Sequence, residues 1–377
     1  MRRALLVFAF PLWAAPVASA ADSVTFAVAP QPVTYGSVAT FSGSIAPAVE
    51  GEPVELRMVT STGSTVLATT PAAADGTFRF TAQVRAPGTF FARAAPASSA
   101  EIALLVRPLL SATISPRTAL IGSLVMLSGR LVPAGAGAVK LTVAGTARMV
   151  PVGSTGAFRA RLPATRGGYF TARLDVIPAA GWAPIARARR YRIVLPWLRL
   201  GSYGPSVRYL EALLWNRRYA LRGVDRSFRY DTYEAVIAFQ KVRGFARTGV
   251  VSPSLWGYLI RSRAPYARIN SGDHIEVLKG KQVLFEVRSG RVVRVIHVST
   301  GATGNTPRGR WRIYWKTPGL NALGMYYSNY FIGGFAIHGY HSVPPWPASH
   351  GCVRTPMWTA RGIYNRWPRG SIVYVLS

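Results

Sequence analysis

An internal repeat in the first half of the chain restricts its fold most strongly. The segment YGSVATFSGSIAP at 35–47 aligns with IGSLVMLSGRLVP at 121–133, 86 residues later. Further along, DGTFRFTAQV and GTFFAR (88–93) align with TGAFRARLPA and GYFTAR (168–173). Each copy consists of short alternating runs rich in Val, Thr, Phe and Leu, separated by Gly, Pro and Asp-Gly turns, which is typical of antiparallel strands. The repeat therefore predicts two copies of one all-β fold.

Strands of this length and spacing favour β-sandwiches of the immunoglobulin-like type, which we place at residues 22–107 and 108–196. Phe78 and Phe158 occupy equivalent strand positions and are expected to be core residues. Neither copy contains a recognisable catalytic constellation. We interpret both as spacers or adhesive surfaces.

The composition changes to a helical pattern at about Leu198. Apolar residues recur at helical spacing at positions 207, 210, 213 and 214, and again at 235, 236 and 239. A third helix is predicted to begin at Ser252 or Pro253. This pattern resembles the type 1 peptidoglycan-binding domain, a small three-helix module, and we place it at 198–262. The glycine usual after the Asp225 position is displaced here by Arg226 and Ser227.

The last part of the chain, residues 273–377, returns to strands. The run HIEVLKGKQVLFEVRSGRVVRVIHVST alternates and contains Lys-Gly and Ser-Gly turns. One short helix is predicted from Pro356 or Met357 to Tyr364, followed by a strand at 371–376. The expected fold class is therefore multidomain: two all-β sandwiches, a three-helix domain and a mostly β C-terminal domain.

Residues 337–354 read IHGYHSVPPWPASHGCVR and contain the only cysteine, Cys352. His350 lies two residues before it and His338 fourteen before it. One thiol forms no internal disulfide, and a cysteine among histidines and glycines is a candidate nucleophile. An imidazole accepts the thiol proton and stabilises the thiolate. In an extended segment His350 and Cys352 face the same side, so spacing alone leaves His350 and His338 both open as the base.

The motif SHGCVR preceded by IHG resembles the signature of the L,D-transpeptidase (YkuD-type) catalytic domain, which remodels bacterial peptidoglycan. The segment TGATGNTPRGRWRIYWK at 300–316 adds a match to the TP-x-G segment of that domain. The resemblance implies that Cys352 is the nucleophile and His338 the proton donor and acceptor. It also implies that the Gly339 carbonyl orients His338 and that His350 shapes the pocket.

Further residues are assigned to the site by their places around the motif. Gly351 is expected to contribute a backbone N–H to an oxyanion site. Arg354 lies two residues beyond Cys352, where a guanidinium can anchor a carboxylate or carbonyl of a peptide stem, with a structural ion pair as the alternative. Substrate binding is also assigned to Tyr326, Tyr327 and Ser349.

The resemblance implies acyl transfer from a tetrapeptide stem to an amine acceptor, which makes 3→3 cross-links. An L,D-carboxypeptidase using the same acyl-enzyme, or a wall-binding protein without catalysis, remains as an alternative. Papain-like wall peptidases place the cysteine well before the histidine, whereas His338 precedes Cys352 here. No cofactor is needed, and no metal is expected because the histidines lack the usual ligand spacing.

The first twenty residues, MRRALLVFAFPLWAAPVASA, are typical of a secretory signal cleaved after Ala20, with an uncleaved anchor as the alternative. No later stretch is apolar enough to span a membrane, so export to the cell wall or periplasm is expected. The formal charge of +31 falls to +29 without Arg2 and Arg3. Export favours peptidoglycan stem peptides and glycan as partners, together with anionic wall polymers, and not nucleic acid.

Overall fold

The computed structural model describes residues 20–377, so the signal predicted at 1–20 lies, except for its last residue, outside the described residues. The chain divides into two compact units. One comprises residues 20–114, 126–160 and 171–189, and the other comprises 115–125, 161–170 and 190–377. No helix in residues 20–377 combines the length and the apolar character that a membrane span needs.

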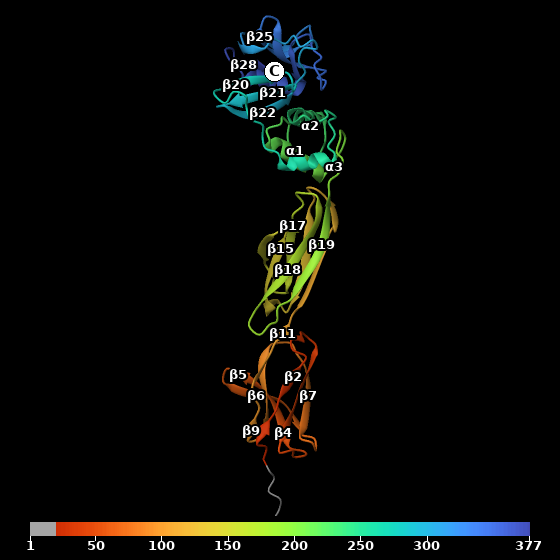
Figure 1. Ribbon diagram of the computed structural model, residues 1–377, viewed down its shortest axis with the longest axis vertical. Coiled ribbons are helices and arrows are strands. Elements are labelled where there is room, and N and C mark those ends of the chain that lie inside the picture. The colour runs from red at the N-terminus through yellow and green to blue at the C-terminus, as the bar shows by residue number, and fades with distance from the viewer. Residues whose placement is uncertain (1–19) are drawn as a thin grey trace, which may run out of the picture. The chain divides into compact units, whose positions relative to one another are not determined.

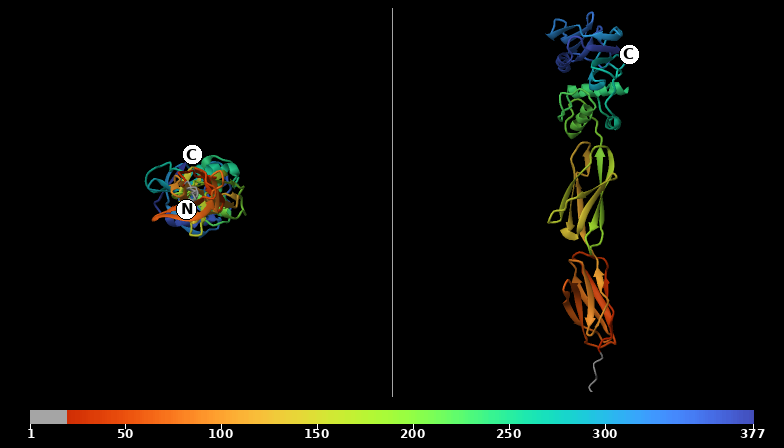
Figure 2. Two further views of the ribbon diagram at one scale, coloured as in Figure 1. Left: turned by 90° about the horizontal axis from the view of Figure 1, so that it is seen from below. Right: turned by 90° about the vertical axis from the view of Figure 1, so that its left-hand side faces the viewer.

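The first β-sandwich pairs its strands mainly into two sheets (Figures 1 and 2). One has the order β1-β4-β2, with β7 also paired to β4, and the other has the order β10-β8-β5-β6, with β9 on β8; β3 and β11 form a parallel pair. The strands are β1 (Ser23–Val24), β2 (Ala27–Ala29), β3 (Val33–Thr34), β4 (Val38–Ala46), β5 (Pro53–Thr60), β6 (Gly63–Pro71), β7 (Thr77–Gln83), β8 (Gly88–Ala94), β9 (Ala97–Ser98), β10 (Ile102–Leu104) and β11 (Val106–Arg107).

The second copy of the repeat has a three-stranded sheet, β12-β14-β17, and a five-stranded sheet, β13-β19-β18-β15-β16. Its elements are β12 (Leu109–Ser115), β13 (Thr118–Leu120), β14 (Val125–Val132), the 3-10 turn η1 (Ala134–Ala136), β15 (Gly137–Val143), β16 (Thr146–Val150), β17 (Ala157–Leu162), β18 (Gly168–Pro178) and β19 (Ala186–Val194).

A glycine and a phenylalanine pack against each other in the same way in both copies. Phe78 in β7 and Phe158 in β17 are both buried, as core residues are expected to be. A Cβ on Gly43 would lie 2.7 Å from the ring of Phe78, and one on Gly129 would lie 2.3 Å from the ring of Phe158. These two glycines are 86 residues apart, which is the offset of the repeat. The repeat in the sequence is therefore a repeat in core packing.

Three helices follow, α1 (Pro205–Asn216), α2 (Tyr230–Arg243) and α3 (Pro253–Arg261). Ser252 caps α3 by accepting a hydrogen bond from the backbone N–H of Leu255 at 3.2 Å, which satisfies one of the free donors of the first turn. Gly244 ends α2 in the left-handed conformation with φ +75°, a common stop for a helix. The predicted three-helix domain is confirmed.

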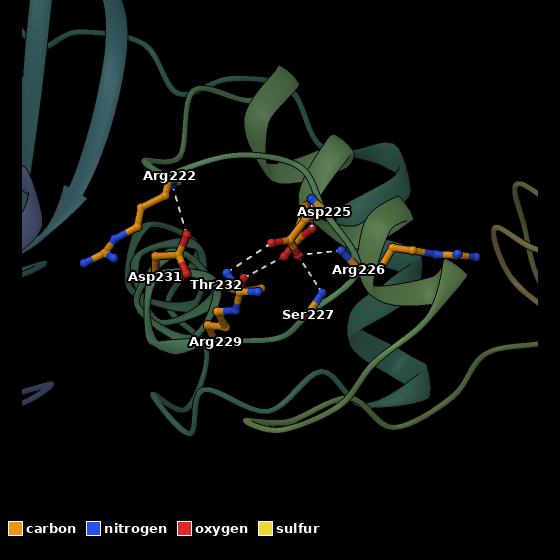
Figure 3. A network of polar contacts seen from close by, with 8 residues as sticks. Arg222, Asp225, Arg226, Ser227, Arg229, Asp231 and Thr232 are labelled. Atoms are coloured by element: carbon orange, nitrogen blue, oxygen red, sulfur yellow. Dashed lines mark hydrogen bonds and ion pairs between the residues drawn. The ribbon is translucent and has the colours of Figure 1, made fainter.

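The basic loop before α2 is ordered by carboxylates (Figure 3). Asp225 accepts hydrogen bonds from the backbone N–H groups of Arg226 and Ser227, so an aspartate turn replaces the displaced glycine. Buried Glu211 accepts from the N–H of Asp225 at 2.8 Å and from the hydroxyl of Thr232 at 2.8 Å. Burial raises the pKa of Glu211. Carboxylate acceptors thus fix the loop to α1 and α2, in addition to the buried side chain of Phe228.

The C-terminal domain has two sheets and one helix (Figure 1). The five-stranded sheet has the order β22-β21-β20-β28-β23, with β20 and β28 parallel, and the four-stranded sheet has the order β24-β25-β26-β27, with β26 and β27 parallel. The elements are β20 (His274–Leu278), β21 (Val283–Arg288), β22 (Arg291–His297), β23 (Gly309–Arg312), β24 (Trp315–Leu320), β25 (Tyr326–Ile332), β26 (Phe335–Tyr340), β27 (Val353–Pro356), α4 (Met357–Arg366) and β28 (Ile372–Leu376).

One hydrophobic core in this domain joins residues of both sheets and α4, including Ile275, Ile337, Val353 and Ile363. Polar and apolar residues alternate in this part of the sequence, but every residue of β20 is buried. Glu276 shows the reason, because its carboxylate accepts hydrogen bonds from backbone N–H groups at 268 and 269. The linker before β20 covers the polar side of the strand, and the carboxylate satisfies the linker backbone. The multidomain fold class itself is confirmed.

Gln240 supplies a test of the three-helix fold. It is buried; its Nε2 donates to Thr248 Oγ1 and to Val250 O, and its Oε1 accepts from Gly249 N. We expect Gln240→Leu to lower the free energy of opening of this domain by about 2 kcal/mol, because the 248–250 backbone loses its partners. Native-state hydrogen exchange of the full chain measures it. The exposed Gln83→Leu variant is the control, and an equal loss in both variants would contradict the assignment.

Candidate active site

Two parallel strands position the candidate nucleophile and base. β26 pairs with β27 so that His338 lies opposite Arg354. Cys352 directly precedes β27, and its Sγ lies 3.4 Å from the backbone N of Ala336, two residues before His338. The loop between the two motif histidines therefore folds back, and Cys352 and His338 occupy neighbouring places along one strand pair.

The thiol of Cys352 is partly exposed. The N–H of Ala336 points to Sγ, and Sγ lies 3.7 Å from the carbonyl oxygen of Gly334. Burial raises the pKa of the thiol above its ordinary value, while the Ala336 N–H and the charge of Arg354 lower it. The resting sulfur is therefore a thiol at neutral pH, and nucleophilic attack requires a base.

The ring of His338 is buried and is oriented by its own strand. Its Nδ1 lies 2.9 Å from the carbonyl oxygen of Gly339. Because a carbonyl only accepts, Nδ1 carries the hydrogen and Nε2 of the neutral ring keeps a lone pair. Burial lowers the pKa of His338, the Gly339 bond raises it, and Arg354 lowers it, with a net lowering. The imidazole is therefore neutral at pH 7, as a general base must be.

His338 and Cys352 do not contact each other directly. Among the hydrogen bonds of residues 20–377, none joins the His338 ring to Sγ, which instead faces the backbone at 334–336. A general base must come within hydrogen-bond reach of the proton that it takes, directly or through one water. Proton transfer here requires the thiol to rotate away from Gly334, or a bridging water.

The turn from Ser349 to Cys352 is closed by its own side chains. The buried hydroxyl of Ser349 accepts from Gly351 N at 3.0 Å and donates to Cys352 O at 2.6 Å. The sequence assigned Ser349 to substrate binding and the Gly351 N–H to an oxyanion site, but both groups are engaged within this turn. Gly351 has φ +134°, and a Cβ there would lie 2.2 Å from the ring of Phe335. These groups shape the turn that presents the sulfur.

The segment 301–306 holds the same turn. Thr306 Oγ1 donates to Gly351 O at 2.7 Å and accepts from Gly301 N at 2.9 Å. Asn305 Nδ2 donates to His350 O at 2.7 Å. Thr306 belongs to the Thr-Pro motif seen in the sequence, whereas the role of Asn305 was missed and only its place before that motif signals it. The motif and the residue before it thus hold the backbone beside the thiol by hydrogen bonds.

His350 takes part in the site through its backbone. Its ring is exposed, and within residues 20–377 it forms no hydrogen bond or ring contact, while its carbonyl is held by Asn305. Of the two candidate bases, only His338 has a ring nitrogen oriented by a partner.

Arg354 contacts an aromatic ring instead of a carboxylate. Its Cζ lies 4.1 Å from the ring centroid of Tyr340, a cation–π arrangement. Tyr340 in turn meets His338 edge-on, with ring centroids 5.8 Å apart. Sequence reasoning missed Tyr340, although its place two residues after His338 on one strand puts it on the same face. Tyr340 fixes the guanidinium beside the imidazole, where its charge lowers the pKa of both His338 and Cys352.

The two predicted tyrosines pack with each other, and Tyr327 packs against α4. Tyr326 lies opposite Gly339 and meets Tyr327 edge-on at 4.7 Å. Tyr327 adopts φ +48° at a register shift of β25, and its ring meets Tyr364 of α4 at 5.1 Å. A Cβ on Gly339 would lie 2.8 Å from Ala360 Cβ of α4, so the Gly339 face is the covered face of the sheet. The contact with Tyr364 places the Tyr327 ring on this covered face. His338 precedes Gly339 in the strand and faces the opposite side, so Tyr327 is not brought to the His338 face.

Within residues 20–377 there is no group of three or more His, Cys, Asp or Glu side chains that could hold a metal ion.

Comparison with protein families identifies two domains in the chain. Residues 272–375 match the family model of the L,D-transpeptidase catalytic domain (YkuD), and residues 203–259 match that of a peptidoglycan binding domain. The chain matches none of the curated proteins with which it was compared.

Solved structures of L,D-transpeptidases are also similar to parts of the chain. One from Xylanimonas cellulosilytica is 34% identical, with 48% of this chain and 97% of that chain covered and a TM-score of 0.46. One from Stackebrandtia nassauensis is 23% identical, with coverages of 48% and 95% and a TM-score of 0.31. One from Mycobacterium tuberculosis is 12% identical, with coverages of 70% and 97% and a TM-score of 0.26.

The family match covers the strands and the turn that carry His338 and Cys352. The chain is therefore an L,D-transpeptidase, with a YkuD catalytic domain at residues 272–375 and a peptidoglycan-binding domain at residues 203–259.

Proposed function

We propose that this enzyme uses Cys352 to transfer an acyl group from a tetrapeptide stem of peptidoglycan to the amine of a second stem, making a 3→3 cross-link. One observation carries the proposal: the 2.9 Å contact between His338 Nδ1 and Gly339 O leaves Nε2 free as a base, on the strand beside the only thiol of the chain. A thiol and a neutral, oriented imidazole on the neighbouring strand are the two groups that acyl transfer through a cysteine requires.

Each proton in the mechanism passes through His338. As Sγ attacks the carbonyl carbon between the third residue and the terminal D-Ala, Nε2 takes the thiol proton. The C–N bond then breaks, D-Ala leaves with that proton, and a thioester remains on Cys352. The acceptor amine attacks the thioester, Nε2 takes a proton from it, and the proton returns to sulfur when the C–S bond breaks. We assign the developing oxyanion to the N–H of Cys352, because that of Gly351 is already donated to Ser349.

We assign substrate anchoring to Arg354. Its guanidinium lies on the Tyr340 ring beside the imidazole and, among the described residues, forms no ion pair, so its N–H groups are available to a stem carboxylate or carbonyl. Ser349 is reassigned to holding the turn, and Tyr326 is not assigned to the substrate because it lies opposite Gly339 on the covered face of the sheet.

The remaining parts of the chain are proposed to deliver this site to its substrate. We propose domain boundaries at 22–107, 108–196, 198–262 and 273–377, with the two β-sandwiches acting as spacers. Export by the segment 1–20 would place the enzyme in the cell wall or periplasm. The formal charge of +29 that is left after Arg2 and Arg3 are removed from the +31 of the full chain would then favour contact with anionic wall polymers, because opposite charges attract over about a Debye length.

Substitution of the two proposed catalytic residues tests the chemistry. Exposure to a carbapenem, to which this enzyme class is generally sensitive, should add one acyl group to the wild-type protein, detected by intact mass. Cys352→Ser should not be acylated, and His338→Gln should be acylated about 10²- to 10⁴-fold more slowly because the base is lost. His350→Gln is the paired variant: a larger loss there than in His338→Gln would transfer the base role to His350.

The pH dependence of thiol alkylation tests the electrostatics. Because burial raises the pKa of Cys352 above the ordinary value of 9.0, the thiolate fraction should keep rising as pH increases through 9. Iodoacetamide should therefore alkylate the protein faster at pH 9.5 than at pH 8.5, without a plateau between them. A rate that levels off below pH 8 would instead indicate a stabilised resting thiolate. A free cysteine peptide measured in the same buffers is the control.

The acceptor is tested on cell walls. Muropeptides from cells with and without the gene should differ in 3→3 dimers, which form when an amine resolves the thioester. Accumulation of tripeptides without such dimers would identify water as the acceptor, and therefore an L,D-carboxypeptidase. No difference in either product, together with an unreactive Cys352, would support a wall-binding protein without catalysis.

A further inference from the structure

Helix α2 of the peptidoglycan-binding domain carries a buried lysine that contacts the catalytic domain. Lys241 is 2% exposed, and its Nζ lies 2.9 Å from Gln282 O, 2.8 Å from Val298 O and 2.6 Å from His297 Nδ1. Burial lowers the pKa of Lys241 to about 6, but all three neighbours of Nζ are acceptors, and only the protonated amine has an N–H donor for each of them. A buried lysine is tolerated only when its donors are satisfied in this way. All three partners of Lys241 belong to the catalytic domain.

His297 extends this contact to the loop beside the active site. Its Nε2 lies 2.7 Å from the carbonyl oxygen of Val343, which lies between the two motif histidines. A carbonyl only accepts, so Nε2 donates, and in a neutral ring Nδ1 then accepts from Lys241. Burial and the charge of Lys241 lower the pKa of His297 to about 3, which keeps the ring neutral. The imidazole thus links an ammonium on one side to a loop carbonyl on the other.

The residues after His297 hold the rest of the loop and the turn of the nucleophile. Ser299 Oγ donates to Trp346 O at 2.7 Å, and Thr300 O accepts from the backbone N–H groups of Ala348 at 2.9 Å and Ser349 at 3.0 Å. Arg354 exchanges two backbone hydrogen bonds with Ser299. Segment 297–300 therefore supports the chain on both sides of Cys352.

A second residue near α2 reaches the same loop. Arg247 Nη1 donates to Pro345 O at 2.7 Å. A different cross-domain contact avoids the loop: Lys281 of the catalytic domain donates from Nζ to Val242 O of α2 at 2.8 Å. The contact between the two domains thus contains Lys241, which is linked through His297 to the loop beside the active site, and Lys281, which has no such link.

We propose that Lys241 is a positioning residue for acyl transfer: through His297 and segment 297–300 it fixes loop 341–348 and the turn that carries Cys352, so the peptidoglycan-binding domain is a structural part of the active site. This role rests on the function proposed above for Cys352. Its consequence is that loss of the Lys241 contacts should slow the chemical step without weakening substrate binding.

Lys241→Met tests this role because it keeps an apolar stem of similar length and removes all three donors. In the full chain, amides of residues 341–349 should exchange with solvent about 10-fold faster, while those of β20 and β21 keep wild-type rates. The limiting rate of carbapenem acylation should fall about 10- to 100-fold, as expected when reacting groups are slightly misplaced. The half-saturating concentration should stay the same. Lys281→Met is the matched control and should leave loop exchange and acylation unchanged.

Two variants of His297 separate the link from simple packing. His297→Gln can still accept from Lys241 and donate to Val343 O through its amide, and should retain most of the acylation rate. His297→Leu fills similar space without either bond and should reproduce the Lys241→Met loss. Equal losses in both His297 variants would overturn the proposed link.

Arg247→Ala keeps the proposal testable if Lys241→Met does not fold, because Arg247 contacts the loop from a more exposed position. It should raise exchange at 341–349 and slow acylation in the same direction. Wild-type exchange and acylation in both Lys241→Met and Arg247→Ala would overturn the proposal, as would a uniform rise in exchange over the whole catalytic domain. If the wild-type protein is not acylated but loop exchange rises as expected, the function assigned to Cys352 fails while the loop support stands.

Discussion

The parallel pairing of β26 with β27 is the constraint on which the site depends. Parallel neighbours cannot be joined by a tight hairpin, so the chain must leave β26 after Tyr340 and return at Val353 through a loop with no strand of its own. That loop brings Cys352 back beside the strand of His338. It also makes the position of the sulfur depend on whatever holds the loop, because a connection of this kind has no ladder to fix it.

Burial and charge then determine the protonation states of Cys352 and His338. Taking the thiol and the imidazole out of water favours their neutral forms, and the charge of Arg354 lowers the pKa of both. For His338 the two effects act together and keep Nε2 unprotonated. For Cys352 they oppose each other, and burial is the larger. Burial therefore favours a thiol at Cys352 and a neutral imidazole at His338.

The sequence predicted the features that depend on local chemistry. The start of α3 at Ser252 follows from residue types at short range, and the 86-residue repeat is visible in the sequence itself; the structure has both. Contacts made across the fold were not predictable. Nothing local distinguishes a serine that binds substrate from Ser349, whose hydroxyl closes its own turn. The motif located Cys352, but several of the groups that hold its turn come from the distant segment 299–306.

Helix α2 shows why the two C-terminal domains are not independent modules. A helix on the surface of a free module buries one face and exposes the other, but residues 235–241 of α2 are all buried. Gln240 and Lys241 are adjacent and serve different domains: Gln240 satisfies the 248–250 loop of its own domain, whereas Lys241 satisfies carbonyls of the catalytic domain. Separating the domains would expose the side of the helix that packs against the catalytic domain and would remove the lysine donor from those carbonyls. The catalytic turn is therefore supported by a helix that the sequence places in another domain.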